Sequence, residues 1–88
     1  MIDDASISTT VCQALARQLA LAPEDIALHQ RLREDLGLDS LDLSLVALRL
    51  ERALRREFPL AVLDLVTSVH DLVRFVRAWA GGVSEGTR

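Results

Sequence analysis

Ser40 is the residue of this sequence whose type and position best suit covalent chemistry. It stands in the run Leu36-Gly37-Leu38-Asp39-Ser40-Leu41, where a predicted loop ends and an amphipathic helix begins. A serine there offers an exposed hydroxyl, and the unpaired N–H groups at the positive end of the helix favour a phosphate on it. Equally, Asp39 or Ser40 could serve only as the N-cap. The residue pattern alone leaves both interpretations open.

The remaining reactive side chains do not support catalysis by the chain itself. A nucleophilic serine needs a base within hydrogen-bonding distance, and His29 and His70 have no predicted route to Ser40. Neither histidine has further ligands at metal-site spacing, and there is no Gly-rich phosphate loop. Cys12 is predicted to pack as a small apolar residue. We therefore predict a protein that is not an enzyme and binds no metal. Another protein could still modify Ser40.

Composition limits the fold and the compartment. The 88 residues, half of them hydrophobic, predict one small domain without a deep catalytic cavity. A core of Leu, Val and Ala with two Phe and one Trp suits packed helices. No apolar run is long enough to span a membrane, and a single cysteine favours a reducing cytoplasm. We expect a cytoplasmic monomer.

Charge is distributed unevenly along the chain. Residues 1–48 hold eight acidic residues and three arginines, for a formal charge of −5, whereas residues 49–88 hold five acidic residues and seven arginines, for +2. The acidic half contains Ser40, which favours partners with basic surfaces. A net charge of −3 without interleaved aromatic and basic residues argues against nucleic acid as a partner.

The first half of the chain predicts one helix and a long loop. A helix capped near Ser8 has apolar residues at four-residue spacing. They are Ile7, Val11, Leu15 and Leu19. Pro23 ends that helix, and residues 21–39 are predicted as a long loop. Four apolar residues are expected to pin this loop to the bundle: Ile26, Leu28, Leu32 and Leu36.

A second helix is predicted from Ser40 to Leu54, and it has two apolar faces. Its core stripe comprises Leu43, Val46, Ala47, Leu50 and Leu54. A second row is formed by Leu41, Leu45 and Leu48. A helix apolar on two sides is either fully buried or offers one face to a partner. We interpret the second row as a docking strip, the alternative being that the long loop buries it.

The last third of the chain predicts a short helix and a long one. Phe58-Pro59 marks the start of the short helix, which includes Leu60 and Leu63. Thr67 or Ser68 caps the last helix, which Gly81-Gly82 is expected to end. Its core stripe comprises Val69, Leu72, Val73, Val76 and Ala80, flanked by Phe75 and Trp79. The prediction is an all-α, four-helix single domain over residues 1–88, with its core at 8–80 and a flexible tail at 81–88.

The stretch from Leu32 to Asp42 closely resembles the phosphopantetheine attachment site of acyl carrier proteins, whose signature is an acidic-Leu-Gly-x-Asp-Ser-Leu run. Phe58-Pro59 looks like the pair that opens the family's third helix, and Val66-Thr67-Ser68-Val69 like the start of its fourth. The resemblance covers about residues 8–80. It implies a discrete, stand-alone member of that family with the family's four-helix bundle.

The resemblance also implies a site and its partners. Ser40 would bear 4′-phosphopantetheine, transferred from coenzyme A by a phosphopantetheinyl transferase, with Asp39 and Leu41 framing the arm. The arm would hold acyl or polyketide intermediates as thioesters. Acyl- or aminoacyl-loading enzymes, ketosynthases or acyltransferases would then be the partners. The residues expected to contact them are Leu41, Asp42, Leu45, Leu48, Arg49 and Arg52.

The sequence departs from the strongly acidic helices of primary-metabolism carriers. Four arginines interrupt the second helix and the segment after it: Arg49, Arg52, Arg55 and Arg56. Because charge complementarity governs partner choice, we expect a carrier dedicated to a specialised pathway. Leu38-Asp39 favours an acyl over a peptidyl carrier, although a discrete aminoacyl carrier stays open. So do a helical interaction module in which Ser40 is only a cap, and a serine that is phosphorylated for regulation.

Overall fold

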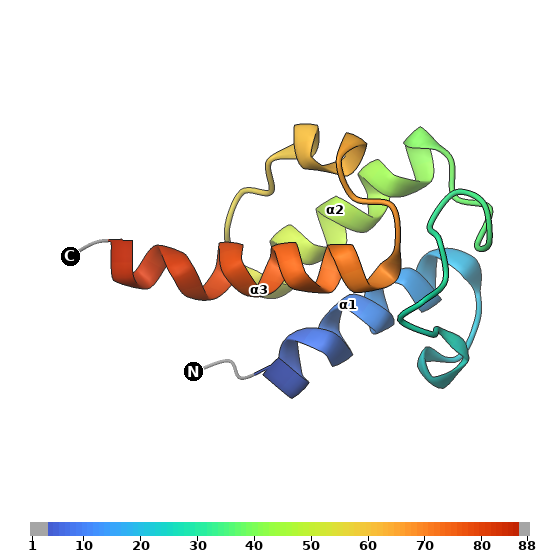
Figure 1. Ribbon diagram of the computed structural model, residues 1–88, viewed down its shortest axis with the longest axis horizontal. Coiled ribbons are helices and arrows are strands. Elements are labelled where there is room, and N and C mark those ends of the chain that lie inside the picture. Colours follow the sequence, from blue (N-terminus) through green and yellow to red (C-terminus); the bar gives the residue numbers. More distant parts are fainter. Residues whose placement is uncertain (1–3, 87–88) are drawn as a thin grey trace.

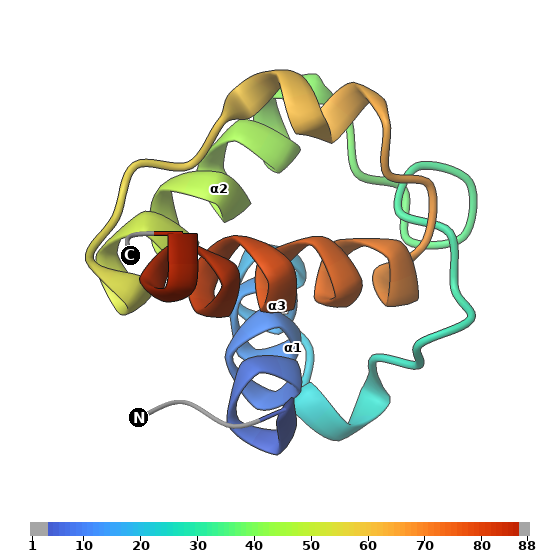
Figure 2. The ribbon, with the colours of Figure 1, turned by 60° about the vertical axis from the view of Figure 1, so that its left-hand side comes forward.

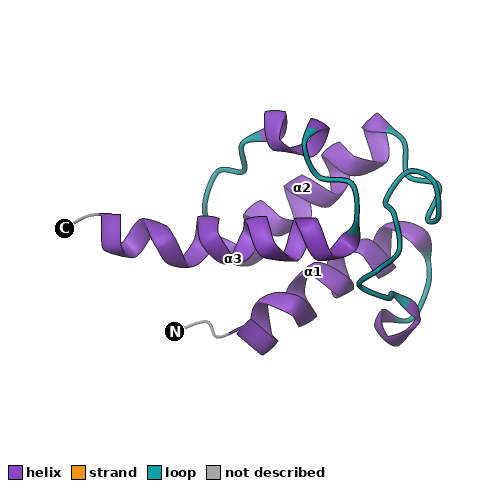
Figure 3. Ribbon diagram, in the orientation of Figure 1, coloured by secondary structure: helices purple, strands orange, loops and turns teal. Residues whose placement is uncertain are grey.

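The apolar stripes of the sequence become the buried faces of three α-helices. The computed structural model describes residues 4–86, with side chains described for residues 6–80. The elements in order are α1 (Asp4–Leu19), the 3-10 turn η1 (Pro23–Asp25), α2 (Ser40–Leu54), the 3-10 turn η2 (Leu60–Asp64) and α3 (Val69–Gly86). Residues 4–86 contain no strand (Figure 3), so the all-α class is confirmed.

Helix α1 contacts both other α-helices and so lies at the centre of the packing. Figures 1 and 2 show α3 crossing α1 at an angle, with the loop between η1 and α2 at one end of the bundle, on the right of both views. Turn η2 lies against α2. The bundle therefore brings the loop, the start of α2 and η2 to one region of the molecule.

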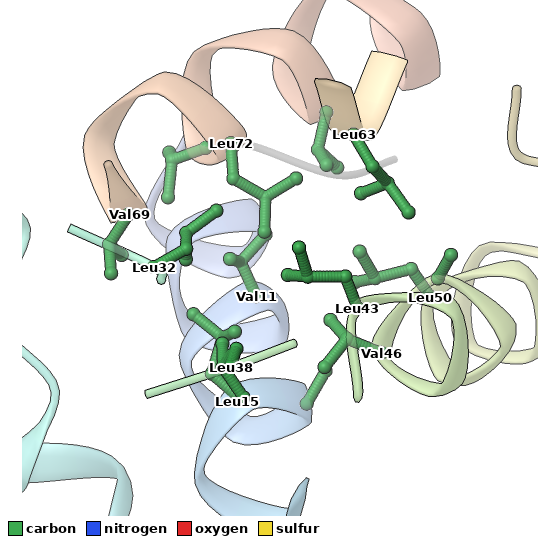
Figure 4. Close-up of a cluster of buried hydrophobic side chains, with 14 of the residues drawn as sticks. Val11, Leu15, Leu32, Leu38, Leu43, Val46, Leu50, Leu63, Val69 and Leu72 are labelled. Atoms are coloured by element: carbon green, nitrogen blue, oxygen red, sulfur yellow. The ribbon is translucent and has the colours of Figure 1, made fainter. Parts of the chain in front are cut away.

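The predicted core stripes are confirmed as the interior. Helix α1 contributes Ile7, Val11 and Leu15, helix α2 contributes Leu43, Val46, Ala47 and Leu50, and α3 contributes Val69, Leu72, Val73 and Val76. Leu32 and Leu38 from the loop join them, and so does Leu63 from η2 (Figure 4). Leu19 and Leu54 are only partly buried at the margin, where each of their helices ends. Ala80, predicted in the stripe of α3, is also only partly buried. The loop therefore shares the core with the helices.

Two predicted helix boundaries are wrong. The predicted short third helix is present as the 3-10 helix η2, because a five-residue segment cannot recover the cost of nucleating an α-helix. Helix α1 begins at Asp4 instead of near Ser8, since an acidic residue is favourable at the positive helix end. Helix α3 continues through Gly81-Gly82 to Gly86, because glycine weakens a helix by only about 1 kcal/mol and keeps its backbone donor. Residues 87–88 of the predicted tail lie outside the described residues.

All three aromatic side chains form one cluster that joins the chain after α2 to α3. Phe58 makes edge-to-face contacts with Phe75 and Trp79, with ring centroids 5.5 and 5.2 Å apart. The guanidinium of Arg56 lies 5.4 Å from the Trp79 ring centroid. The Phe58 backbone N–H donates to the Glu51 carboxylate at 2.7 Å. Trp79 is therefore a suitable fluorescent reporter of folding.

Arg55 ends α2 in the left-handed conformation, with φ 58° and ψ 44°. Non-glycine residues are strained there, whereas glycine adopts it freely. Arg55→Gly is expected to raise the free energy of unfolding by about 0.5–1 kcal/mol, measured by urea denaturation. Arg74→Gly, the same change inside α3, should lower it by about 1 kcal/mol. Equal effects of the two substitutions would show that the Arg55 conformation carries no strain.

Candidate functional site

Ser40 is the first residue of α2, and its side chain is exposed. The preceding Asp39 is the N-cap: its carboxylate accepts the N–H of Asp42 at 2.8 Å, and the Asp42 carboxylate accepts the N–H of Asp39 at 3.2 Å. This reciprocal capping box satisfies the helix start without the Ser40 hydroxyl. The sequence left open whether Asp39 or Ser40 is the N-cap of this helix. In the structure the N-cap is Asp39.

The Ser40 hydroxyl forms no hydrogen bond with the described part of the chain. The backbone N–H groups of Ser40 and Leu41 also find no acceptor in residues 4–86, whereas those of Asp42 and Leu43 donate to Asp39. An exposed hydroxyl beside two free N–H groups at the positive end of a helix suits a phosphate ester. The geometry therefore fits a phosphate on Ser40.

Backbone hydrogen bonds fix the loop before Ser40 to the start of α3. The Leu32 N–H donates to the Thr67 carbonyl at 2.8 Å, and the Val69 N–H donates to the Gln30 carbonyl at 2.9 Å. The second of these bonds supplies an acceptor for one of the N–H groups that a helix start leaves unpaired. The start of α3 thus holds in place the loop that leads to Ser40.

The apolar anchors of this loop are mostly as predicted. Ile26 and Leu32 are buried and Leu36 is partly buried, but Leu28 is 44% exposed. The prediction for Leu28 is wrong because its backbone, not its side chain, holds the loop. Its carbonyl accepts the N–H of His70 at 2.9 Å.

Gly37 turns the chain toward Ser40 with φ +72°. That left-handed conformation strains residues with a side chain. A Cβ at Gly37 would meet no atom within 4 Å, so the requirement for glycine is conformational and not steric. The next amide, Leu38 N–H, donates to the Leu32 carbonyl at 3.0 Å and closes the turn.

A small hollow of about 90 Å³ lies beside Ser40, between the start of α2 and η2. Its lining comprises Arg33, Ser40, Leu43, Ser44, Leu60, Leu63 and Asp64. Neither histidine belongs to it. No group of three potential metal ligands occurs among the described residues. Burial raises the pKa of the Cys12 thiol and so favours its protonated, unreactive form. The only carboxylate in this lining is that of Asp64.

The Asp42 carboxylate is engaged on both oxygens, which the sequence did not indicate. Besides the Asp39 N–H, it accepts the side-chain amide of Gln18 from α1 at 2.9 Å. These hydrogen bonds, the Asp39 backbone donor foremost, hold the pKa of Asp42 below its usual value. At the start of α3, the N–H groups of Thr67 and Ser68 likewise lower the pKa of Asp71. The Ser68 hydroxyl accepts the Asp71 N–H at 3.1 Å, so of the two predicted caps, Thr67 and Ser68, the structure has Ser68.

The lowered pKa values predict a specific loss of stability in acid. A carboxylate with a lowered folded-state pKa stabilises the fold above its unfolded-state pKa, about 3.9, and loses that contribution as the pH falls through the lower folded-state value. We expect the urea midpoint to fall as the pH drops from about 5 to about 3, and to fall less in Asp42→Asn. Asp25→Asn is the control, because the Asp25 carboxylate accepts no hydrogen bond within residues 6–80. An unchanged acid response in Asp42→Asn would contradict the prediction.

The predicted docking strip of Leu41, Leu45 and Leu48 is exposed on α2, at 67, 39 and 43%. The alternative that the long loop buries it is therefore wrong. Leu60 and Leu65, in and after η2, are also exposed, at 54 and 79%. The sequence analysis assigned Leu60 to a helix and did not single out Leu65.

Arg49 and Arg52 lie on the α1 side of α2, where they line a groove with Arg17. The sequence analysis singled out Arg49 and Arg52 but not Arg17. Arg17 is distant in sequence and joins them only through the packing of α1 against α2. Arg17 follows Gln13 by four positions, and Gln13 also lines the groove, so both lie on one face of α1.

Comparison with known proteins gives the family. The family model described as "Phosphopantetheine attachment site" matches residues 9–76. The chain belongs to the acyl carrier protein family. It is 30% identical over 66 residues to an acyl carrier protein of Campylobacter fetus, covering 75% of this chain and 86% of the relative. It is 31% identical over 71 residues to one of Prochlorococcus marinus, covering 81% and 89% of the two chains.

Membership of the acyl carrier protein family supplies the cofactor and the class of activity. The cofactor is a covalently attached 4′-phosphopantetheine, and the protein is a carrier, not an enzyme. Acyl carrier proteins interact with a phosphopantetheinyl transferase and with biosynthetic enzymes. The free hydroxyl of Ser40 and the two open N–H groups beside it suit the phosphate of such an arm. In residues 4–86 no helix is long and apolar enough to cross a membrane.

Proposed function

We propose that Ser40 bears the 4′-phosphopantetheine arm and that the protein carries acyl or polyketide intermediates to partner enzymes in a specialised pathway. The observation that supports this best is the exposed Ser40 hydroxyl, which is free because Asp39 provides the helix cap. Asp39 holds the turn, and Leu41 flanks the arm with an exposed apolar side chain. When bound, the arm supplies a thiol that holds the cargo as a thioester.

The test is intact-mass spectrometry after incubation with coenzyme A and a phosphopantetheinyl transferase. The mass should rise by one arm, and peptide mapping should place the gain on Ser40. No gain with several transferases would overturn the proposal. A gain equal to a phosphate in protein from its own host would instead support regulation by phosphorylation. The mass of any cargo on the arm separates an acyl from an aminoacyl carrier.

The proposed docking surface lies next to the arm. It comprises Leu41, Asp42, Leu45, Leu48, Arg49 and Arg52. The exposed leucines provide the apolar area that a partner can bury. Asp42 contributes by positioning, since its carboxylate is already bound by Asp39 and Gln18. Acyl- or aminoacyl-loading enzymes, ketosynthases and acyltransferases are the proposed partners.

The proposed specialisation rests on charge. Arginines on and after α2 oppose the attraction of an enzyme surface built for an acidic carrier. If ketosynthases of primary fatty-acid synthesis extend chains on this carrier as efficiently as on their own, the specialisation is excluded. A matched carrier from the same cells, loaded by the same transferase, is the control.

The remaining parts of the proposal concern domain and setting. We take residues 8–80 as the core of a single carrier domain over residues 1–88, with η2 in the place of the family's short third helix. We further propose a cytoplasmic monomer, and the single cysteine suits a reducing compartment. Sedimentation equilibrium of the full chain tests the monomer.

A further inference from the structure

A basic groove of about 310 Å³ runs between α1 and α2. Its lining comprises Thr10, Gln13, Ala14, Arg17, Arg49, Arg52 and Ala53. Every charged residue in this lining is an arginine, although the chain as a whole has a net charge of −3. Positive charges gathered in one groove attract anions and raise their local concentration there.

These three arginines have no anionic partner within the described residues. The ion pairs found there join Arg31 to Glu34 and Asp35, in the loop. The Nε atom of Arg49 is buried and makes no hydrogen bond. An unsatisfied buried N–H group is unfavourable until an acceptor reaches it. The three arginines that line the groove thus lack a carboxylate partner in residues 6–80, and carboxylates bind guanidinium groups through paired hydrogen bonds.

The groove is larger than a single small anion needs. A second hollow of about 320 Å³ shares Gln13 and Arg17 with it and continues past the end of α1 to Leu21 and Pro23. The two hollows combine cationic, neutral and apolar lining, which suits a segment of peptide. Arg52 follows Leu48 by four residues on α2, so the groove adjoins the docking strip.

We propose that this groove binds an acidic peptide segment of a partner protein, with Arg17, Arg49 and Arg52 pairing with its Asp or Glu carboxylates. The identity of that protein as an enzyme served by the carrier rests on the proposed function, whereas binding of the segment does not require the arm. A partner that buries the leucine strip would then place its acidic segment in the groove. The groove therefore favours an acidic partner segment, whereas the acidic N-terminal half of the chain favours partners with basic surfaces.

The test is a nuclear magnetic resonance titration of the full-length, ¹⁵N-labelled chain with blocked hexaglutamate peptide. Saturable shifts are expected in the Nε–Hε signals of Arg17, Arg49 and Arg52, and they should weaken as salt is added. Arg17→Gln/Arg49→Gln should raise the dissociation constant about tenfold, as expected for the loss of two charge-assisted contacts at a partly exposed site. Glutamine keeps a good helix propensity, so α1 and α2 should persist.

Arg55→Gln/Arg74→Gln is the matched control, since it removes the same charge outside the groove. Its dissociation constant should stay within about twofold of the starting protein. The proposal is overturned if both double variants weaken binding equally, if hexaglutamate causes no shift, or if sulfate binds as tightly. Dimerisation that the groove variant abolishes would also overturn it, in favour of a second copy as the occupant. Attachment of the arm, measured by intact-mass spectrometry on the same samples, tests the carrier function separately.

Discussion

Ser40→Ala is expected to abolish attachment of the phosphopantetheine arm while leaving the fold intact. Attachment forms a bond between the Ser40 oxygen and phosphorus as the pyrophosphate bond of coenzyme A breaks and adenosine 3′,5′-bisphosphate leaves, and alanine has no atom that can replace that oxygen. The helix start does not depend on the hydroxyl, because the capping box joins Asp39 and Asp42. The free energy of unfolding should therefore change by no more than about 0.5 kcal/mol. Intact mass and urea denaturation of the same preparation measure both effects.

The matched control is Ser44→Ala. Ser44 is exposed one turn later on α2, its hydroxyl donates to the Ser40 carbonyl at 3.0 Å, and it lines the same hollow. It should gain one arm as the unchanged chain does. A full gain of mass in Ser40→Ala would show that the arm is attached to another residue. A Ser40→Ala chain that accepts no arm but keeps its activity with a partner would support a helical interaction module instead.

The helices and their buried faces could be predicted because apolar spacing reports directly on burial. Leu43, Val46 and Leu50 recur at helical spacing, and each is fully buried. The start of α2 could also be predicted, since both Asp and Ser are favoured at helix N-termini. The exposed strip also followed from the sequence: a domain this small has no second layer to cover another apolar face.

The helix boundaries depended on energies too small for a pattern to decide. Gly81-Gly82 marks a helix end by propensity, yet α3 runs through it, since about 1 kcal/mol per glycine does not terminate a helix. The segment at Leu60–Asp64 had the composition of a helix but not the length. Leu28 looked like an anchor because the pattern cannot distinguish side-chain burial from a backbone hydrogen bond.

The site could be predicted as a serine at a helix start, but not its supporting contacts. Asp39 and not Ser40 caps the helix because the Asp39 carboxylate accepts the Asp42 N–H, while the Asp42 carboxylate accepts both the Asp39 N–H and the Gln18 amide. Likewise Arg17 and Arg49 share a groove only because α1 packs on α2. Contacts between segments this distant in sequence require the tertiary structure.

Leu32→Ala is expected to remove about 2–5 kcal/mol from the free energy of unfolding, which is a large part of the roughly 5–10 kcal/mol available to a domain of this size. Leu32 is 1% exposed and carries the loop into the core (Figure 4). Its N–H donates to Thr67 and its carbonyl accepts from Leu38. Urea denaturation followed by Trp79 fluorescence and circular dichroism measures the loss.

Leu65→Ala is the control, because that side chain is 79% exposed and its loss should change stability by no more than about 0.5 kcal/mol. If the free energy of unfolding falls by less than about 1 kcal/mol in Leu32→Ala, the neighbouring side chains move into the space and leave no cavity. The loop would then be held mainly by its backbone bonds to Thr67, Val69 and His70. In the expected case the same substitution should also slow arm attachment, since Ser40 follows directly from the turn that Leu32 anchors.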